Sequence, residues 1–253
     1  MKIKKLFVAI AVSMAVAFSF TTCIEGGQKF NATLPAVVEY TGLNQVLWTA
    51  YGNYVPDNAS ASSLQSLLSG SCIIMSFEYN SEYQTGQYPV ASKIQYQEVG
   101  VSSIFDDDAA DRDIAYDYPL SSVKFFNESF SPYYKGRFFV ETEAKLATNQ
   151  ALDYILYYKS GEELDANGAR NIYLQAHLPA TQGGTQDVAE MRALDLSNMI
   201  YYSGRDTTIK EDGIDYSIKY LKINLKYISG IENEVPVYKS ASTQPIYIYT
   251  FKD

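Results

Sequence analysis

Apolar and polar residues alternate with a period of two along much of the second half of the chain. Residues 137–146 and 171–178 both follow this pattern, which is typical of strands with one buried and one solvent-facing side. In the second of these strands, Tyr173, Gln175 and His177 are expected on the outward side. No long amphipathic helix pattern appears, so the sequence predicts a mainly β fold of antiparallel sandwich or barrel domains.

The first half of the chain contains short apolar runs separated by turn-forming residues, which indicate further strands. The strands are predicted at residues 36–40, 46–51, 72–79 and 92–104, and residues 52–58 are dense in turn formers. Residues 61–69 predict a short helix, because Leu64, Leu67 and Leu68 have helical spacing and Ser60 could cap its start.

The alternation changes phase once, within residues 216–228. Tyr216, Ile218 and Tyr220 share one face, and from Leu221 onward the apolar positions move by one residue. Since such a slip would turn the apolar side chains toward solvent, the sequence predicts a β-bulge near Tyr220 and Leu221.

The first 22 residues have the pattern of an export signal that ends at a lipid-attachment cysteine. Three lysines near the start precede an apolar run at residues 6–20, and Cys23 follows at the position where a lipoprotein signal peptidase would cut. The run is shorter than the roughly 20 apolar residues of a membrane-spanning helix. We therefore expect acyl chains on Cys23 to anchor the protein in a membrane outside the cytoplasm, at the outer membrane or the cell surface.

The overall charge is strongly negative. The formal net charge of the full chain is −9, and removal of residues 1–22 would take away only basic residues among its charged groups. An acidic surface repels phosphate backbones, so the sequence argues against nucleic-acid binding.

An acidic segment, residues 105–119, interrupts the strand pattern. It has no room for an element with an apolar face, and we interpret it as a linker or a long exposed loop. The alternative is a calcium site, because closely spaced carboxylates suit a hard cation. Its candidate ligands are Asp106, Asp108, Asp111 and Asp113, although the spacing departs from an EF-hand loop. No other cofactor is indicated.

No set of catalytic residues stands out. His177 is the single histidine and lies on the outward face of a predicted strand, and no Gly-x-Ser-x-Gly motif surrounds any serine. Glu141 and Glu143 share a strand face, but Lys145 continues that face, as expected of a solvated surface. These observations favour a protein that is not an enzyme, with a carboxylate-dependent hydrolase as the less favoured alternative.

Two further positions have candidate roles. Cys72 lies in the apolar run Cys-Ile-Ile-Met and is expected to be a buried, inert thiol. Asp206-Thr207-Thr208 matches a short bacterial O-glycosylation pattern, which makes Thr207 a candidate attachment site.

Several stretches together resemble NigD-like lipoproteins of Bacteroidetes. They are the lysine-rich leader to Cys23, residues 67–79, residues 171–178, residues 193–197 and residues 220–229. The family's usual Gly-Asp-Arg before the barrel strand is replaced here by Ser69-Gly70-Ser71. The resemblance implies a small OB-like β-barrel followed by an antiparallel β-sandwich, and it implies no catalytic residues.

The expected organisation is a signal peptide at 1–22, a tether at 23–35, an OB-like domain at 36–104, the acidic linker at 105–119 and a β-sandwich at 120–253. The expected function is that of a non-catalytic cell-envelope lipoprotein with an accessory or protein-interaction role. The alternative is a surface glycan-binding protein in which exposed tyrosines or Trp48 form a stacking platform.

Overall fold

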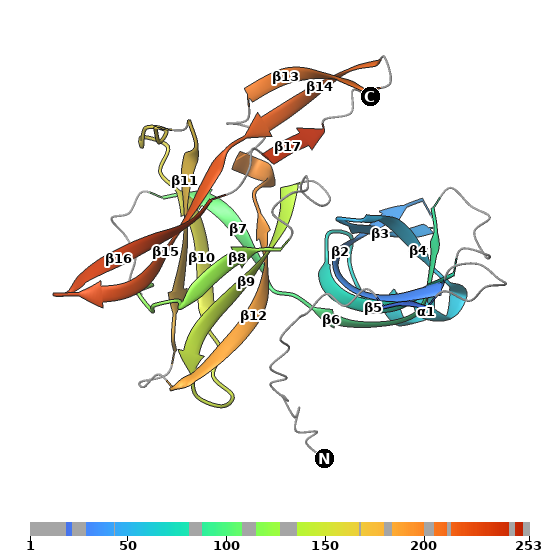
Figure 1. Cartoon of the computed structure of the whole chain (residues 1–253), viewed down its shortest axis with the longest axis horizontal. Coiled ribbons are helices and arrows are strands. Elements are labelled where there is room, and N and C mark those ends of the chain that lie inside the picture. Colours follow the sequence, from blue (N-terminus) through green and yellow to red (C-terminus); the bar gives the residue numbers. More distant parts are fainter. Residues whose placement is uncertain are drawn as a thin grey trace.

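Seventeen strands in three sheets, together with the short helix α1, make up the described part of the chain (Figure 1). The computed structural model describes residues 19–21, 29–42, 44–80, 88–107, 115–126, 136–166, 168–179, 184–199, 205–211, 214–242 and 246–249. Within these residues no helix has both the length and the apolar character that a membrane crossing requires. The mainly β fold class predicted from the sequence is confirmed.

The first sheet closes into a small barrel. Its strands are β1 (Ser19–Thr21), β2 (Lys29–Thr41), β3 (Asn44–Thr49), β4 (Gly52–Pro56), β5 (Cys72–Asn80) and β6 (Val90–Glu98). They lie in the order β1-β2-β3-β4-β6-β5, and β2 also pairs with β5, which closes the ring. Apolar side chains fill the interior, among them Leu34, Leu47, Ile73, Met75 and Phe77. Five strands closed in this way, with α1 between the third and the fourth, form the expected OB-like barrel.

The barrel begins earlier in the chain than the sequence predicted. Strand β2 pairs with β5 along residues 29–37, so residues 29–35 belong to the barrel and not to the tether expected at 23–35. Strand β1 lies within the expected signal peptide and pairs with the start of β2. Cys23 itself lies outside the described residues.

Helix α1 (Asn58–Leu64) also starts earlier than the predicted range of 61–69. The N-cap is Asp57, whose carboxylate accepts a 2.8 Å hydrogen bond from the backbone N–H of Ser60. This cap satisfies one of the free N–H groups of the first turn. The sequence predicted Ser60 as the capping residue, and the structure places the cap at Asp57 instead. Leu68 lies beyond the helix and is 77% exposed, so the prediction that it shares a buried helix face with Leu64 and Leu67 is wrong.

The second sheet has eight strands and is rolled until it nearly closes. Its strands are β7 (Val101–Asp106), β8 (Ser122–Phe125), β9 (Arg137–Leu146), β10 (Asp153–Tyr158), β11 (Arg170–His177), β12 (Gln186–Asp195), β15 (Ile223–Glu232) and β16 (Val235–Ser242). Their order is β16-β15-β11-β10-β7-β12-β9-β8, and the edge strands β8 and β16 come into contact. Side chains from both halves of the roll pack in one core, including Val140, Leu156, Ile172, Leu194 and Leu225.

The roll is sandwich-like, as expected, but its strand directions are mixed. Strand β7 runs parallel to both β10 and β12, and β11 runs parallel to β15, where the sequence predicted antiparallel pairing. Residues 101–103 pair with β12 and residues 104–106 pair with β10, so β7 joins the two halves of the roll. The chain therefore enters the second sheet at Val101, before the boundary expected at residue 105.

The third sheet is small and contains β13 (Arg205–Glu211), β14 (Ile214–Leu221) and β17 (Ile246–Tyr249). The bulge predicted near Tyr220 and Leu221 is absent from the described pairings: β14 ends at Leu221 and β15 starts at Ile223 in a different sheet. The phase change arises because the chain passes from one sheet to another. Register shifts occur instead between Ile228 and Gly230, and between Ser76 and Glu78.

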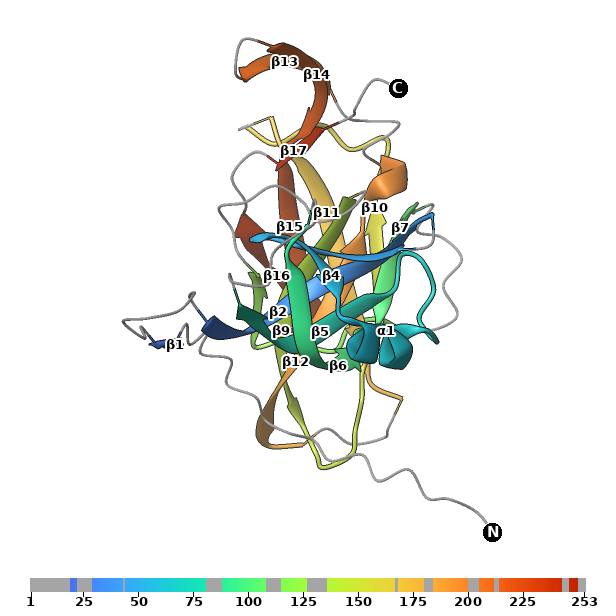
Figure 2. The ribbon, with the colours of Figure 1, turned by 90° about the vertical axis from the view of Figure 1, so that its right-hand side faces the viewer.

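The barrel and the rolled sheet lie side by side (Figure 1), with the barrel in front in the view of Figure 2. A cluster of apolar side chains joins them: Val37, Cys72 and Val99 from the barrel side pack with Phe139 and Ala193 of the rolled sheet. Beside it, Arg137 and Asp195 form an ion pair with an Nη1–Oδ1 distance of 2.7 Å.

Candidate functional site

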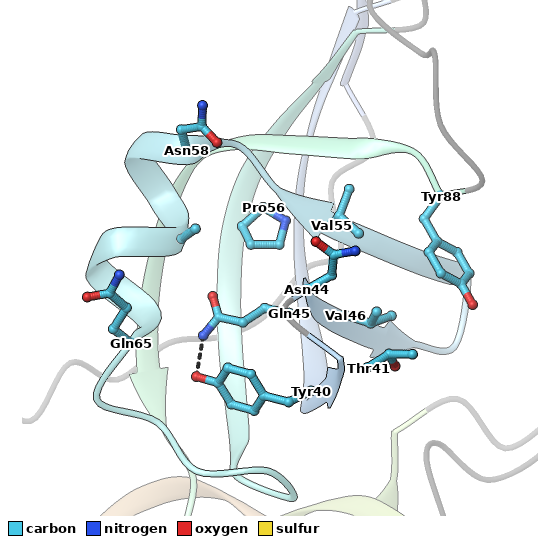
Figure 3. Close-up of a pocket in the computed structure, with 11 residues that line it drawn as sticks. Tyr40, Thr41, Asn44, Gln45, Val46, Val55, Pro56, Asn58, Gln65 and Tyr88 are labelled. Atoms are coloured by element: carbon cyan, nitrogen blue, oxygen red, sulfur yellow. Dashed lines mark hydrogen bonds between the residues drawn. The ribbon is translucent and has the colours of Figure 1, made fainter.

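A pocket of about 600 Å³ lies on the barrel between β3, β4 and α1 (Figure 3). It forms because β3 and β4 separate. Their ladder ends at Leu47 and Tyr54, and beyond that point Pro56 has no N–H to donate to β3. On its other side, β4 pairs with β6 through Val55 and Pro56. The strands therefore diverge next to the helix that follows β4.

The described residues that line the pocket are polar or apolar but uncharged. Hydrogen-bonding groups come from Tyr40, Thr41, Asn44, Gln45, Asn58, Gln65 and Tyr88. Apolar surface comes from Val46, Val55, Pro56 and Ala61. These side chains offer four amides, one aliphatic hydroxyl and two phenols, which can both donate and accept hydrogen bonds.

Gln45 is the innermost polar group of this lining, and its side chain is held in a fixed orientation. The residue is 8% exposed, and its amide nitrogen donates to the backbone carbonyl of Leu64 at 3.1 Å and to the Tyr40 hydroxyl. Because both contacts require the amide nitrogen, the carbonyl oxygen must point the other way. Figure 3 shows this oxygen facing the space between α1 and Pro56.

The Gln45 carbonyl oxygen is buried and has no hydrogen-bond partner in the structure. A buried acceptor without a donor costs about 1–3 kcal/mol, so native proteins seldom keep one without a reason. Its position next to a polar pocket places this acceptor where a bound ligand could supply the donor.

The neighbouring elements hold this arrangement in place. The Tyr40 hydroxyl donates to the backbone carbonyl of Leu67 at 3.0 Å, which ties the end of β2 to the segment after α1. The Ser60 hydroxyl accepts from the backbone N–H of Ile94 at 3.1 Å, which ties α1 to β6. The pocket walls are thus cross-linked by buried contacts.

Chemically, the pocket is suited to binding. The lining residues that the structure describes include no carboxylate, histidine, lysine, arginine or cysteine. General acid–base or nucleophilic catalysis near neutral pH usually depends on groups of these kinds. The second and third strands of an OB barrel, with the loops after its first and fourth strands, are where such barrels bind ligands. Val46, Val55, Asn44 and Tyr88 occupy these places here.

A second polar and aromatic cluster lies on the rolled sheet, on the face that the sequence predicted to be solvated. Tyr173 and Gln175 are buried rather than outward-facing. The Tyr173 ring stacks on Tyr157 at 4.9 Å, and Gln175 donates to the Tyr238 hydroxyl at 2.9 Å.

Glu162 completes this cluster. Its carboxylate accepts from the Tyr173 hydroxyl at 3.0 Å and from the Asn171 amide at 2.7 Å. Burial, followed by the hydrogen bond to Glu162, raises the pKa of Tyr173. With these partners in contact, the cluster stabilises the sheet and leaves its central rings covered.

The candidate metal ligands are only partly within the described residues. Asp106 ends β7, and its carboxylate accepts a 2.9 Å hydrogen bond from the backbone N–H of Ser160. Asp108, Asp111 and Asp113 lie outside the described residues. Among the residues that the structure describes, no group of three or more acidic, histidine or cysteine side chains could hold a metal ion.

Of the other candidate residues, His177 and Glu143 contact neighbouring residues of the fold. His177 Nδ1 lies 2.9 Å from the carbonyl oxygen of Ala115, and Glu143 accepts from the Ser122 hydroxyl at 2.7 Å. Trp48 packs against the cluster between the barrel and the rolled sheet, so it forms no open stacking platform. Thr207 lies in β13 opposite Ile218.

Cys72 is buried, as the sequence predicted. Burial raises the pKa of its thiol to about 12, and nearby Arg137 acts in the opposite direction. The thiol is therefore protonated and unreactive at neutral pH.

Sequence reasoning missed the pocket. The turn formers at residues 52–58 predict a turn and give no sign of a pocket. The signal that could have been used is Gln45, an amide directly before the apolar run Val46-Leu47-Trp48. A polar residue entering a barrel strand must find partners inside, and such positions often mark sites.

Comparisons with known proteins identify the fold. No protein-family model and no curated protein matches the chain. An uncharacterized protein from Parabacteroides merdae has a TM-score of 0.60 and 13% identity, over 86% of this chain and 98% of that chain. A candidate lipoprotein from Bacteroides fragilis has a TM-score of 0.56 and 11% identity, over 88% and 100%.

A NigD-like immunity protein from Bacteroides caccae has a TM-score of 0.50 and 13% identity, over 83% of this chain and 91% of that chain. The resemblance seen in the sequence is thus confirmed at the level of the fold: this chain folds like a NigD-like protein, with an OB-like barrel followed by a second β unit.

Proposed function

We propose that this protein is a non-catalytic, lipid-anchored protein of the cell envelope that acts as a binding module. The observation that carries the proposal is the pocket on the barrel, whose described lining combines amides and phenols with apolar surface and contains no carboxylate, histidine, lysine, arginine or cysteine. Such a lining is suited to holding a ligand without transforming it.

The proteins that share the fold are consistent with this role. One is described as a candidate lipoprotein and another as a NigD-like immunity protein, and neither description names a catalytic activity. The negative charge of the chain further favours protein or glycan partners over nucleic acid.

The anchor is proposed at Cys23, on the outer membrane or the cell surface. Replacement of Cys23 by serine removes the acylated thiol, and we expect the variant to move from the membrane pellet to the soluble envelope fraction. Proteinase K treatment of intact cells would then test surface display, because a protein on the outer face is digested without cell lysis.

A matched control is Cys72→Ser, which leaves the anchor untouched and should stay in the membrane pellet. If the Cys23→Ser variant also remained in the pellet, the protein would be held there by something other than a lipid on this residue, and the anchoring proposal would be wrong.

Glycan binding is the second candidate function, and the barrel pocket favours it. The sequence suggested a platform of exposed tyrosines or Trp48, and the Trp48 form is not supported, because Trp48 packs between the barrel and the rolled sheet. Side-chain amides gathered with tyrosines in one pocket provide another place for the same chemistry.

A further inference from the structure

We infer that the barrel pocket is a saccharide site that takes a neutral, hydroxyl-rich ligand, with Gln45 as the acceptor at its base. This inference rests on the proposed function, since it names the ligand class that the binding module would take. It is carried by three independent features of the pocket: its charge, its unpaired acceptor and its two-sided lining.

The lack of charged side chains in the described lining favours a neutral ligand. Among the described residues no acidic or basic side chain lines the pocket, so a charged ligand would leave water without gaining an opposite charge from them. The acidic chain as a whole further disfavours anionic ligands. A neutral ligand has neither disadvantage.

The unpaired carbonyl oxygen of Gln45 selects a ligand that donates hydrogen bonds. The residue is 8% exposed, and its nitrogen is already bound to Leu64 and Tyr40, so the side chain cannot rotate to satisfy itself. This oxygen is covered in the structure, and a ligand hydroxyl that penetrates to its depth supplies the missing donor. The more exposed amides of Asn44, Asn58 and Gln65 can then donate to and accept from further hydroxyls at the entrance.

The two-sided lining suits a sugar ring. Val46, Val55 and Pro56 supply an apolar strip next to the amides, and the Tyr88 ring lies at the edge of the same space (Figure 3). A pyranose has hydroxyls at its rim and C–H groups on its faces, so it can satisfy both kinds of surface at once. A volume of about 600 Å³ lies within the usual range of roughly 300–1,000 Å³ for small-ligand sites.

The test uses the full-length protein in a detergent without a sugar head group, such as a dimethylamine oxide, because maltoside detergents would compete. Hexasaccharides of glucose, xylose, mannose, galactose and N-acetylglucosamine are titrated in by calorimetry. An oligogalacturonate and an uncharged decapeptide mixture serve as the anionic and peptide probes. We expect at least one neutral sugar to bind more tightly than either of these probes.

Side-chain variants locate the site. Asn58→Ala and Gln65→Ala change exposed pocket amides, and each should weaken binding about three- to tenfold through a lost hydrogen bond. Gln95→Ala and Gln97→Ala change exposed amides on β6 outside the pocket and should leave affinity unchanged. Gln45→Met should weaken binding about tenfold or more, provided that circular dichroism shows a folded protein.

A second readout follows Gln45 directly. In protein labelled with nitrogen-15 at glutamine, the Gln45 side-chain amide signal is identified by its loss in Gln45→Met, and the sugar should shift it. Should Gln45→Met unfold, the exposed Asn58 and Gln65 variants decide the matter. The inference is overturned if no neutral sugar binds, if the pocket variants bind like the wild type, or if the peptide or the anion binds better.

These outcomes are separable from the proposed function. Mass spectrometry of the recovered sugar should find it intact, and cleavage would contradict the non-catalytic role while leaving the site in place. Absence of sugar binding would overturn the site but would not affect the fractionation result for Cys23→Ser.

Discussion

At the scale of single residues, burial decides the chemistry of the reactive groups in this chain. Cys72 could be recognised as a buried thiol from its apolar neighbours in the sequence. Gln45 could not be recognised as a pocket residue, because strand alternation gives the side on which a residue lies but not what it meets there. Tyr40 lies opposite it across the β2–β3 hairpin, but the Leu64 carbonyl reaches it only when α1 packs against the barrel.

The raised pKa of Cys72 predicts a dependence of stability on pH. The thiol has a pKa of about 12 when folded, against about 8.5 when unfolded. Between these values the unfolded state binds fewer protons, so the free energy of unfolding falls as pH rises, by up to about 1.4 kcal/mol per pH unit.

Urea unfolding in a reducing buffer at pH 8 and pH 10 measures this effect. The wild type should lose about 1–2 kcal/mol more than Cys72→Ala over that interval. Other titrating groups, including the buried tyrosines, are common to both proteins and cancel in the comparison. Equal losses in the two proteins would show that the thiol ionises normally in the folded state.

At the scale of elements, the sequence predicted that strands exist but not which strands pair. Period-two alternation correctly marked β9 and β11. The parallel neighbours of β7 come from residues 156–158 and 193–195, far along the chain, and no local pattern encodes such contacts. The local pattern also could not show that β14 and β15 belong to different sheets, so their change of phase resembled a bulge.

Helix α1 gives a prediction at this scale, because it forms one wall of the pocket and is only seven residues long. An isolated helix of this length is unstable, so its cap and its packing must hold it. Asp57→Ala removes the acceptor for the Ser60 N–H and should lower the free energy of unfolding by about 1 kcal/mol.

Chemical denaturation measures this loss, with Ser62→Ala as the control. Ser62 is exposed on the same helix, so its replacement should change the free energy of unfolding by no more than about 0.5 kcal/mol. An Asp57→Ala variant as stable as the wild type would mean that the cap contributes nothing and that packing alone holds the helix.

At the scale of the whole molecule, an apolar cluster joins the barrel to the rolled sheet, and an ion pair between strands β9 and β12 of the rolled sheet lies beside it. The side chains of Arg137 and Asp195 are 21% and 15% exposed, whereas the pair Lys145–Asp187 on the outer surface is 59% and 64% exposed. Arg137→Met leaves Asp195 largely buried without its cation and should cost about 2 kcal/mol. Lys145→Met should cost less than about 0.5 kcal/mol.

Thermal or urea unfolding measures both variants, and the fluorescence of Trp48 reports on the contact, because this single tryptophan packs against the apolar cluster. We expect its emission to move to longer wavelength in Arg137→Met and to stay unchanged in Lys145→Met. If the two substitutions had equal effects, the partly buried ion pair would contribute no more to stability than the exposed one.

The placement of β7 has a practical consequence for cutting the chain into expression fragments. A fragment that starts at residue 105, where the sequence alone suggests a boundary, would lack most of the strand that lies between β10 and β12. Both neighbours would then present unpaired backbone edges, which invite aggregation. A cut before Val101 keeps this strand with its partners, and the short passage through Val99 and Gly100 is therefore the natural place to divide the gene.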